Sequence, residues 1–109
     1  MDIGFFKGKA YSFLNEISYA SGAVVSKIVL KNEAGNVTLF SFDKGQGLSE
    51  HTAPYDAIAQ ILDGKAQITI DNHPHILSEG ESIIMPANVP HALKAIEPFK
   101  MQLIMIKGK

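Results

Sequence analysis

The chain has 109 residues, 10 of them basic and 11 acidic, and its net charge is −1. This length fits a single domain, and without a basic face we expect no nucleic-acid partner. The absence of cysteine excludes disulfides and thiolate zinc sites, and it favours a reducing cytoplasm. We see no signal-peptide core and no apolar run near the roughly 20 residues that cross a bilayer, so we expect a cytoplasmic protein without a membrane partner.

The N-terminal part is the least determined segment. Residues 1–22 are expected to pack on, or pair with, a barrel formed by residues 23–107. Within this part, residues 10–21 (AYSFLNEISYAS) allow either a short helix or a strand with a turn, and Gly22 ends the element in both cases.

From residue 23 the sequence predicts one short strand after another. Runs rich in β-branched and aromatic residues alternate with clusters of Gly, Asn, Asp and Pro. Eight or nine short strands at regular spacing are typical of an all-β sandwich or barrel. The clearest expected strands are residues 23–31, 37–42, 56–62, 66–70, 75–77, 82–85, 91–96 and 99–107.

Two of the connections bear on the topology and the site. DGK at 63–65 is a tight hairpin signal, which predicts that the strands on either side of it pair. NHPH at 72–75 has two close histidines, yet a solvated hairpin turn explains it better than a zinc site. The last strand is apolar on both faces, so we expect it to be covered on both sides, by a partner subunit or by the N-terminal segment.

Two stretches carry a recognisable spacing. The first runs Gly-x5-His-x-Ala-x3-Ala-x6-Gly, at Gly45, His51, Ala53, Ala57 and Gly64. The second runs Gly-x5-Pro-Ala-Asn-x2-His, at Gly80, Pro86, Ala87, Asn88 and His91. Glycine permits the positive φ of tight turns, and Asn88 tolerates it where the pattern has a second glycine.

This spacing closely resembles the two motifs of the cupin superfamily, over about residues 37–107. The resemblance implies a small single-domain, cupin 2-like protein with a double-stranded β-helix (jelly-roll) barrel. Small members of the family are commonly homodimers, so the resemblance also implies a homodimer.

The resemblance further implies where a metal would bind. In typical metal-binding cupins the ligands are two histidines and a glutamate from the first motif and a histidine from the second. The matching positions are His51, Ala53, Ala57 and His91, so two ligands are replaced by alanine. The asparagine that follows in the family is Ala95 here. What is left is a reduced two-histidine metal site, His51 and His91, for weakly bound Fe, Mn, Ni or Zn.

The same histidines have a second interpretation. We expect His51 and His91 to face each other inside the barrel as polar anchors for a small molecule. Small side chains at positions 53, 57 and 59 favour an open apolar pocket. Tyr55, Met85 and Met101 are candidate lining residues, although core packing explains the methionines as well. By strand parity, the side chains at positions 50, 56 and 60 point out of the barrel.

Three functions stay open. The first is binding of a small, largely apolar ligand without catalysis. The second is a metal-dependent enzyme of the dioxygenase or isomerase type. The third is a metal-free enzyme in which His51 or His91 is the general base.

Overall fold

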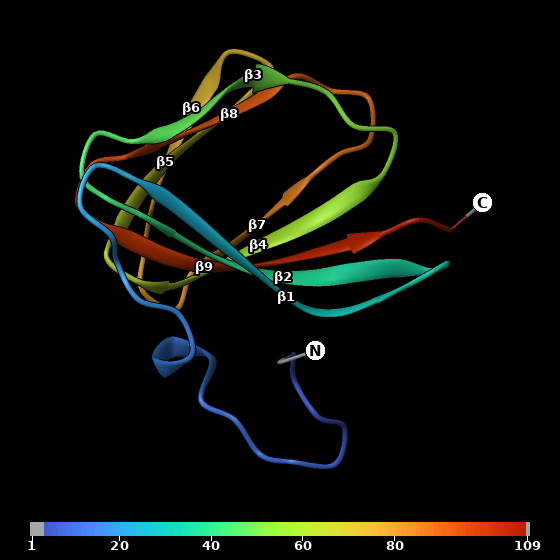
Figure 1. Ribbon diagram of the computed structural model, residues 1–109. Helices are drawn as coiled ribbons and strands as arrows, with labels where there is room; N and C mark the ends of the chain where they lie inside the picture. The colour runs from blue at the N-terminus through green and yellow to red at the C-terminus, as the bar shows by residue number, and fades with distance from the viewer. Residues whose placement is uncertain (1–3, 109) are drawn as a thin grey trace.

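The computed structural model describes residues 4–108 and shows two antiparallel sheets that face each other (Figure 1). Sheet A has the order β1-β2-β9-β4-β7, and sheet B has the order β3-β8-β5-β6. The all-β prediction is confirmed. The elements are the 3-10 turn η1 (Phe13–Asn15) and the strands β1 (Val24–Asn32), β2 (Gly35–Phe42), β3 (Gly47–His51), β4 (Asp56–Asp63), β5 (Lys65–Ile70), β6 (His73–Ser78), β7 (Ser82–Met85), β8 (His91–Ala95) and β9 (Phe99–Ile106).

The space between the sheets is filled by one hydrophobic core. Alternation along each strand sends every second side chain inward, as in β2, where Phe40 and Phe42 face the core. Phe42 and Phe99 are both fully buried and stack with their ring centroids 4.4 Å apart. The remaining buried members of this core are Ala57, Ala59, Ile61, Ala66, Ile68, Leu77, Met85, Leu93, Ala95 and Met101.

The hairpin predicted at residues 63–65 is wrong. β4 belongs to sheet A and β5 to sheet B, so the two strands do not pair with each other. Gly64 instead forms the corner at which the chain leaves one sheet for the other. Its φ is +84°, and a Cβ there would overlap the carbonyl oxygen of Pro98. The glycine signal was correct for a tight turn, but it does not specify which strand the chain pairs with next.

The N-terminal segment lies on the outer face of sheet A (Figure 1). Of the two elements considered for residues 10–21, the short helix is present only as one turn of 3-10 helix, η1, and no strand forms there. The segment is tied down by hydrogen bonds: Ser41 Oγ donates to Ser18 O at 2.8 Å, and Lys100 Nζ donates to Leu14 O at 2.8 Å. Ile17 is buried at 3% exposure. This segment therefore covers one part of the outer face.

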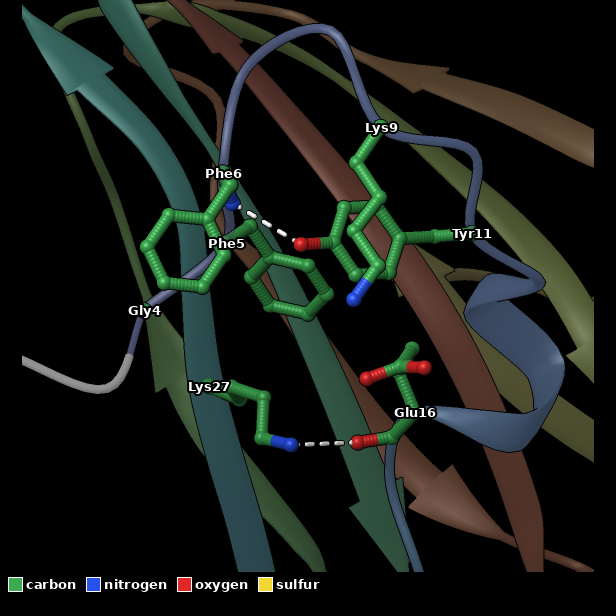
Figure 2. Close-up of a pocket in the computed structure, with 7 residues that line it drawn as sticks. All are labelled: Gly4, Phe5, Phe6, Lys9, Tyr11, Glu16 and Lys27. Carbon is green, nitrogen blue, oxygen red and sulfur yellow. Dashed lines mark hydrogen bonds between the residues drawn. The ribbon is translucent and has the colours of Figure 1, made fainter.

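Its first residues form a small aromatic cluster against β1 (Figure 2). Phe5 packs edge-on against Tyr11, with ring centroids 4.8 Å apart. Lys27 of β1 donates to the Glu16 carbonyl at 2.6 Å and lies 5.6 Å from the Phe5 ring centroid. A hollow of about 190 Å³ lies among these side chains and Lys9. Sheet A separates this cluster from the histidines of sheet B (Figure 1).

Among residues 4–108, no helix has the length and apolar character that would let it span a bilayer.

Candidate functional site

His51 and His91 are brought together, as expected. They are direct partners across the β3–β8 ladder, and their ring centroids lie 4.4 Å apart at an interplanar angle of 69°. His91 is buried at 7% exposure, whereas His51 is exposed at the rim. The register shifts between Leu48 and His51, so β3 is irregular where it reaches the site. One imidazole therefore faces the interior and the other faces the entrance.

The backbone fixes the tautomer of both rings. His51 Nδ1 lies 2.7 Å from the Ser49 carbonyl oxygen, and His91 Nδ1 lies 3.2 Å from the Val89 carbonyl oxygen. A carbonyl only accepts hydrogen bonds, so each Nδ1 must carry the proton. In the neutral rings both Nε2 atoms are then acceptors. Within residues 4–108 neither Nε2 has a hydrogen-bond partner, which leaves two acceptors for a ligand.

Burial lowers the pKa of His91, because desolvation disfavours the charged imidazolium. The hydrogen bond to Val89 opposes this effect, and the positive charge of a protonated His51 adds to it. His91 is therefore held neutral to lower pH than an ordinary histidine, which keeps its Nε2 lone pair available.

We expect acidification to destabilise the fold through His91. Its folded-state pKa is below the unfolded value, so the unfolded chain takes up the proton first. The contribution of His91 to the free energy of unfolding is fully present above the unfolded-state pKa of about 6.5. It is lost as pH falls through the lowered folded-state pKa. Urea unfolding of wild type and His91→Gln at a series of pH values checks this. The variant should show the smaller loss, whereas His75→Gln, at an exposed histidine of β6, should follow wild type. Equal slopes for wild type and His91→Gln would contradict the assignment.

The rest of the family's ligand set is missing from the three-dimensional site as well. Ala57 is buried at 6% exposure and Ala53 is half-buried, and neither side chain can coordinate a metal. Among the described residues, no group of three or more His, Cys, Asp or Glu side chains is placed to hold a metal ion. Stable zinc sites use three or four protein ligands. Two imidazoles therefore do not fit a firmly held divalent cation.

Two hydrogen bonds join the loops that flank the histidines. The Ala87 amide donates to Asp56 Oδ1 at 2.8 Å, and the Asn88 amide donates to the Ala53 carbonyl at 2.7 Å. Asn88 adopts φ +65°, as predicted for a residue that replaces glycine. Asp56 is exposed, as its parity predicted, and its carboxylate holds the second loop instead of entering the barrel. These bonds fix the entrance next to His51 and His91.

The other predicted lining residues lie in different surroundings. Met85 and Met101 are 3% and 1% exposed and belong to the packed core. Tyr55 is half-buried and lines an open hollow of about 380 Å³ with Pro54. Lys107 Nζ lies 5.6 Å from the Tyr55 ring centroid. Core packing thus accounts for both methionines, while the hollow beside Tyr55 is lined by neither His51 nor His91.

The hairpin turn expected at NHPH is shorter than predicted, and the strand expected at residues 75–77 begins two residues earlier. The turn is confined to Asp71 and Asn72, with φ of +50° and +68°, and both histidines lie in strand β6. They share a face with Leu77, which belongs to the core. His73 pairs with Ile70, which in turn pairs with His91, so it extends the row of His51 and His91 along the inner face of sheet B.

His73 and His75 line an open hollow of about 540 Å³ at the gap between β6 and β7. The other lining residues are Asp71 and four apolar residues, Ile70, Ile83, Ile84 and Pro86. The only signal in the sequence was the i, i+2 spacing of the two histidines, which places both on one face only if the segment is a strand.

Two facing antiparallel sheets, with paired histidines at one end of the space between them, define a double-stranded β-helix protein. The chain belongs to the cupin family, because the model of the cupin domain matches residues 38–107. No functionally curated protein matches the chain.

Solved structures with this fold include three close neighbours. A conserved protein of unknown function from Streptococcus pyogenes is 37% identical, with 94% of this chain and 90% of that chain covered and a TM-score of 0.88. A cupin superfamily protein from Desulfitobacterium hafniense is 26% identical, with 94% of each chain covered and a TM-score of 0.87. A cupin 2 conserved barrel domain protein from Leptotrichia buccalis is 41% identical, with a TM-score of 0.81; 84% of this chain and only 44% of that longer chain are covered.

Proposed function

We propose that the barrel binds a small, largely apolar molecule without catalysis, and that His51 and His91 are its polar anchors. The observation that supports this proposal is the pair of Nε2 acceptors at the rim of an apolar interior. Acceptors are matched by donors, so the ligand should present a hydroxyl or amine group to the histidines. Its apolar body would then lie towards Ala57 and Ala53, where the side chains are small.

The chain has no arginine, and the described residues around the pair offer alanine side chains in place of charged ones. Recognition of phosphate or carboxylate groups commonly uses the planar fork of arginine. A neutral ligand with one polar end therefore suits the site better than a strongly anionic one.

A metal-dependent enzyme of the dioxygenase or isomerase type is the second candidate. One observation favours it: an Nδ1–H bonded to a carbonyl with a free Nε2 is the arrangement of metal-ligating histidines. The donor set opposes it, because water or substrate would have to supply the remaining ligands of Fe, Mn, Ni or Zn. If bound there, the ion would polarise a substrate oxygen.

Binding of p-cresol and 4-methylanisole tests the proposal, because the two probes differ in the hydroxyl donor. We expect p-cresol to bind about 5- to 10-fold more tightly, the equivalent of one hydrogen bond of about 1 kcal/mol. Titrations followed by NMR would measure both affinities, for wild type and for His51→Ala/His91→Ala. The preference should disappear in the double variant and should survive dialysis against EDTA.

Two other results would count against this function. Equal affinities for the two probes in the wild type would remove the role of the histidines as acceptors. A preference abolished by EDTA, together with near-stoichiometric metal that the double variant lacks by inductively coupled plasma mass spectrometry, would put the metal-dependent enzyme first.

A further inference from the structure

The hollow of about 190 Å³ between the N-terminal segment and β1 is lined by charged and aromatic side chains (Figure 2). Two cations and one anion border it: Lys9 precedes η1, Glu16 follows η1, and Lys27 lies on β1. The remaining lining residues are Gly4, Phe5, Phe6 and Tyr11. Sheet A lies between this hollow and the histidines of sheet B, so the hollow is a separate feature of the protein (Figure 1).

Glu16 is held through both of its backbone groups. Its amide donates to the Phe13 carbonyl at 3.1 Å and closes the turn η1, and its carbonyl accepts from Lys27 Nζ at 2.6 Å. The next residue, Ile17, is buried at 3% exposure and anchors the segment. The Glu16 carboxylate therefore projects into the hollow from a fixed backbone (Figure 2).

The opposite wall of the hollow is a loop that reverses its direction at Gly8, whose φ of +81° lies in the region that glycine readily adopts. The Phe6 amide donates to the Tyr11 hydroxyl at 2.9 Å, and Phe5 packs edge-on against the same ring. The hydroxyl accepts this bond and keeps its own proton, so it can still donate to a ligand. Lys9 Nζ lies 5.5 Å from the Tyr11 ring centroid and points into the hollow (Figure 2).

The opposite charges around the hollow do not neutralise one another. Within residues 4–108, no ion pair joins Glu16 to Lys9 or Lys27, and the Glu16 carboxylate has no hydrogen-bond donor. Lys27 uses one of its three N–H donors on the Glu16 carbonyl. In the same part of the chain, the Lys9 amino group contacts only the Tyr11 ring. One carboxylate and two ammonium groups are therefore available to a ligand.

A second hollow, of about 220 Å³, adjoins the first. The two hollows share Phe5, Phe6, Lys9 and Tyr11. The further lining residues of the second hollow are Lys7, Gly8, Val29 and Leu30. Its walls are thus mostly aromatic and aliphatic, whereas the first hollow holds the opposite charges. A charged hollow that continues into a largely apolar one suits a small molecule with a charged head and an apolar body.

The charges decide which head group fits. A plain carboxylate would meet the two lysines but would also face the carboxylate of Glu16, and a plain amine would meet Glu16 but face the two lysines. A zwitterion avoids both repulsions, because each of its charges has a partner of opposite sign. An α-amino acid carries an ammonium and a carboxylate group on one carbon atom, and its side chain would extend past Phe5 and Tyr11 into the adjoining hollow.

We propose that the hollow between the N-terminal segment and β1 binds a free α-amino acid with a large apolar side chain. Lys9 and Lys27 bind its carboxylate, Glu16 binds its ammonium group, and the rings of Phe5 and Tyr11 contact its side chain. The ligand touches both the N-terminal segment and β1, so binding stabilises the contact between them. The site lies outside the barrel and does not depend on what the barrel binds.

Three probes separate the two charges of the ligand. L-Phenylalanine carries both charges, 3-phenylpropionate lacks the ammonium group, and 2-phenylethylamine lacks the carboxylate. In NMR titrations of the full chain we expect phenylalanine to bind about 5-fold more tightly than either analogue, the effect of one exposed charge pair. His51→Ala/His91→Ala should keep this preference, because these histidines lie on the other side of sheet A.

Glu16→Gln should have opposite effects on two of the probes. Loss of the carboxylate should weaken the binding of phenylalanine about 5-fold, whereas 3-phenylpropionate should bind as tightly as before or more tightly. A disturbed loop would weaken both, and that result would overturn the role of Glu16. Lys9→Gln is the second variant and should weaken phenylalanine and 3-phenylpropionate but not 2-phenylethylamine. The matched control is Lys31→Gln, at an exposed lysine of β1 that lines neither hollow; it should change none of the affinities.

Two other results would overturn the proposal. One is equal affinity of the wild-type protein for all three probes, or a preference for phenylalanine that survives both Glu16→Gln and Lys9→Gln. The other is a preference that disappears in His51→Ala/His91→Ala, which would place the amino acid in the barrel.

Discussion

Gly64→Ala is expected to destabilise the barrel by about 4 kcal/mol or more, a loss that only a few kinds of single substitution produce. Two costs combine at this position. The φ of +84° lies in the left-handed region, which costs a residue with a Cβ about 1–2 kcal/mol. The added Cβ would also overlap the Pro98 carbonyl oxygen and lie 2.8 Å from Phe99 Cα, and both neighbours are backbone atoms that cannot rotate away.

Gly80→Ala separates the two costs. Gly80 has nearly the same φ, +88°, but a Cβ there meets nothing within 4 Å. This variant should therefore lose only the conformational part, about 1–2 kcal/mol. Urea unfolding of both variants at one protein concentration gives the comparison. If the two glycines cost the same, the close approach of residues 64 and 98 does not limit the corner between β4 and β5.

The corner at Gly64, which was predicted to be a hairpin, shows what the sequence could and could not predict about the fold. Alternating side chains predicted the strands 37–42 and 56–62 closely, because alternation is a local property of one strand. Pairing is not local. DGK is compatible with a hairpin and with a corner, and the choice depends on distant partners: β4 pairs with β9 and β7, and β5 pairs with β8 and β6.

For the candidate site, too, the sequence predicted what depends on local spacing and missed what depends on the surrounding structure. The spacing of the two motifs brought His51 and His91 together, since it fixes the ladder position of each. It could not show that one ring is exposed and the other buried, because that difference comes from the irregular end of β3. His73 and His75 were missed for a similar reason. A turn of two residues, Asp71 and Asn72, is enough to reverse the chain, so the strand begins earlier than the proline in NHPH suggests.

The barrel therefore has two ends of different character. At one end the histidines, Ala53 and Ala57 combine polar acceptors with small side chains. At the other end Phe42 and Phe99 fill the space between the sheets with stacked rings, both fully buried. Stability should depend on the filled end, and binding on the histidine end.

Phe99→Ala tests this division, and it should lower the free energy of unfolding by about 3–5 kcal/mol, the usual cost of a buried aromatic residue. The reason is the cavity left beside Phe42, whose ring would lose its stacking partner. Phe6→Ala is the control, because Phe6 is 67% exposed and its loss should change stability by no more than about 0.5 kcal/mol. Urea unfolding measures both.

Phe99 lies near the Asp63–Lys100 end of β4 and β9, whereas Asp56 at the opposite end of β4 anchors the loop before His91. The folded Phe99→Ala variant should therefore keep the wild-type preference for p-cresol, and a lost preference would mean that the two ends are coupled.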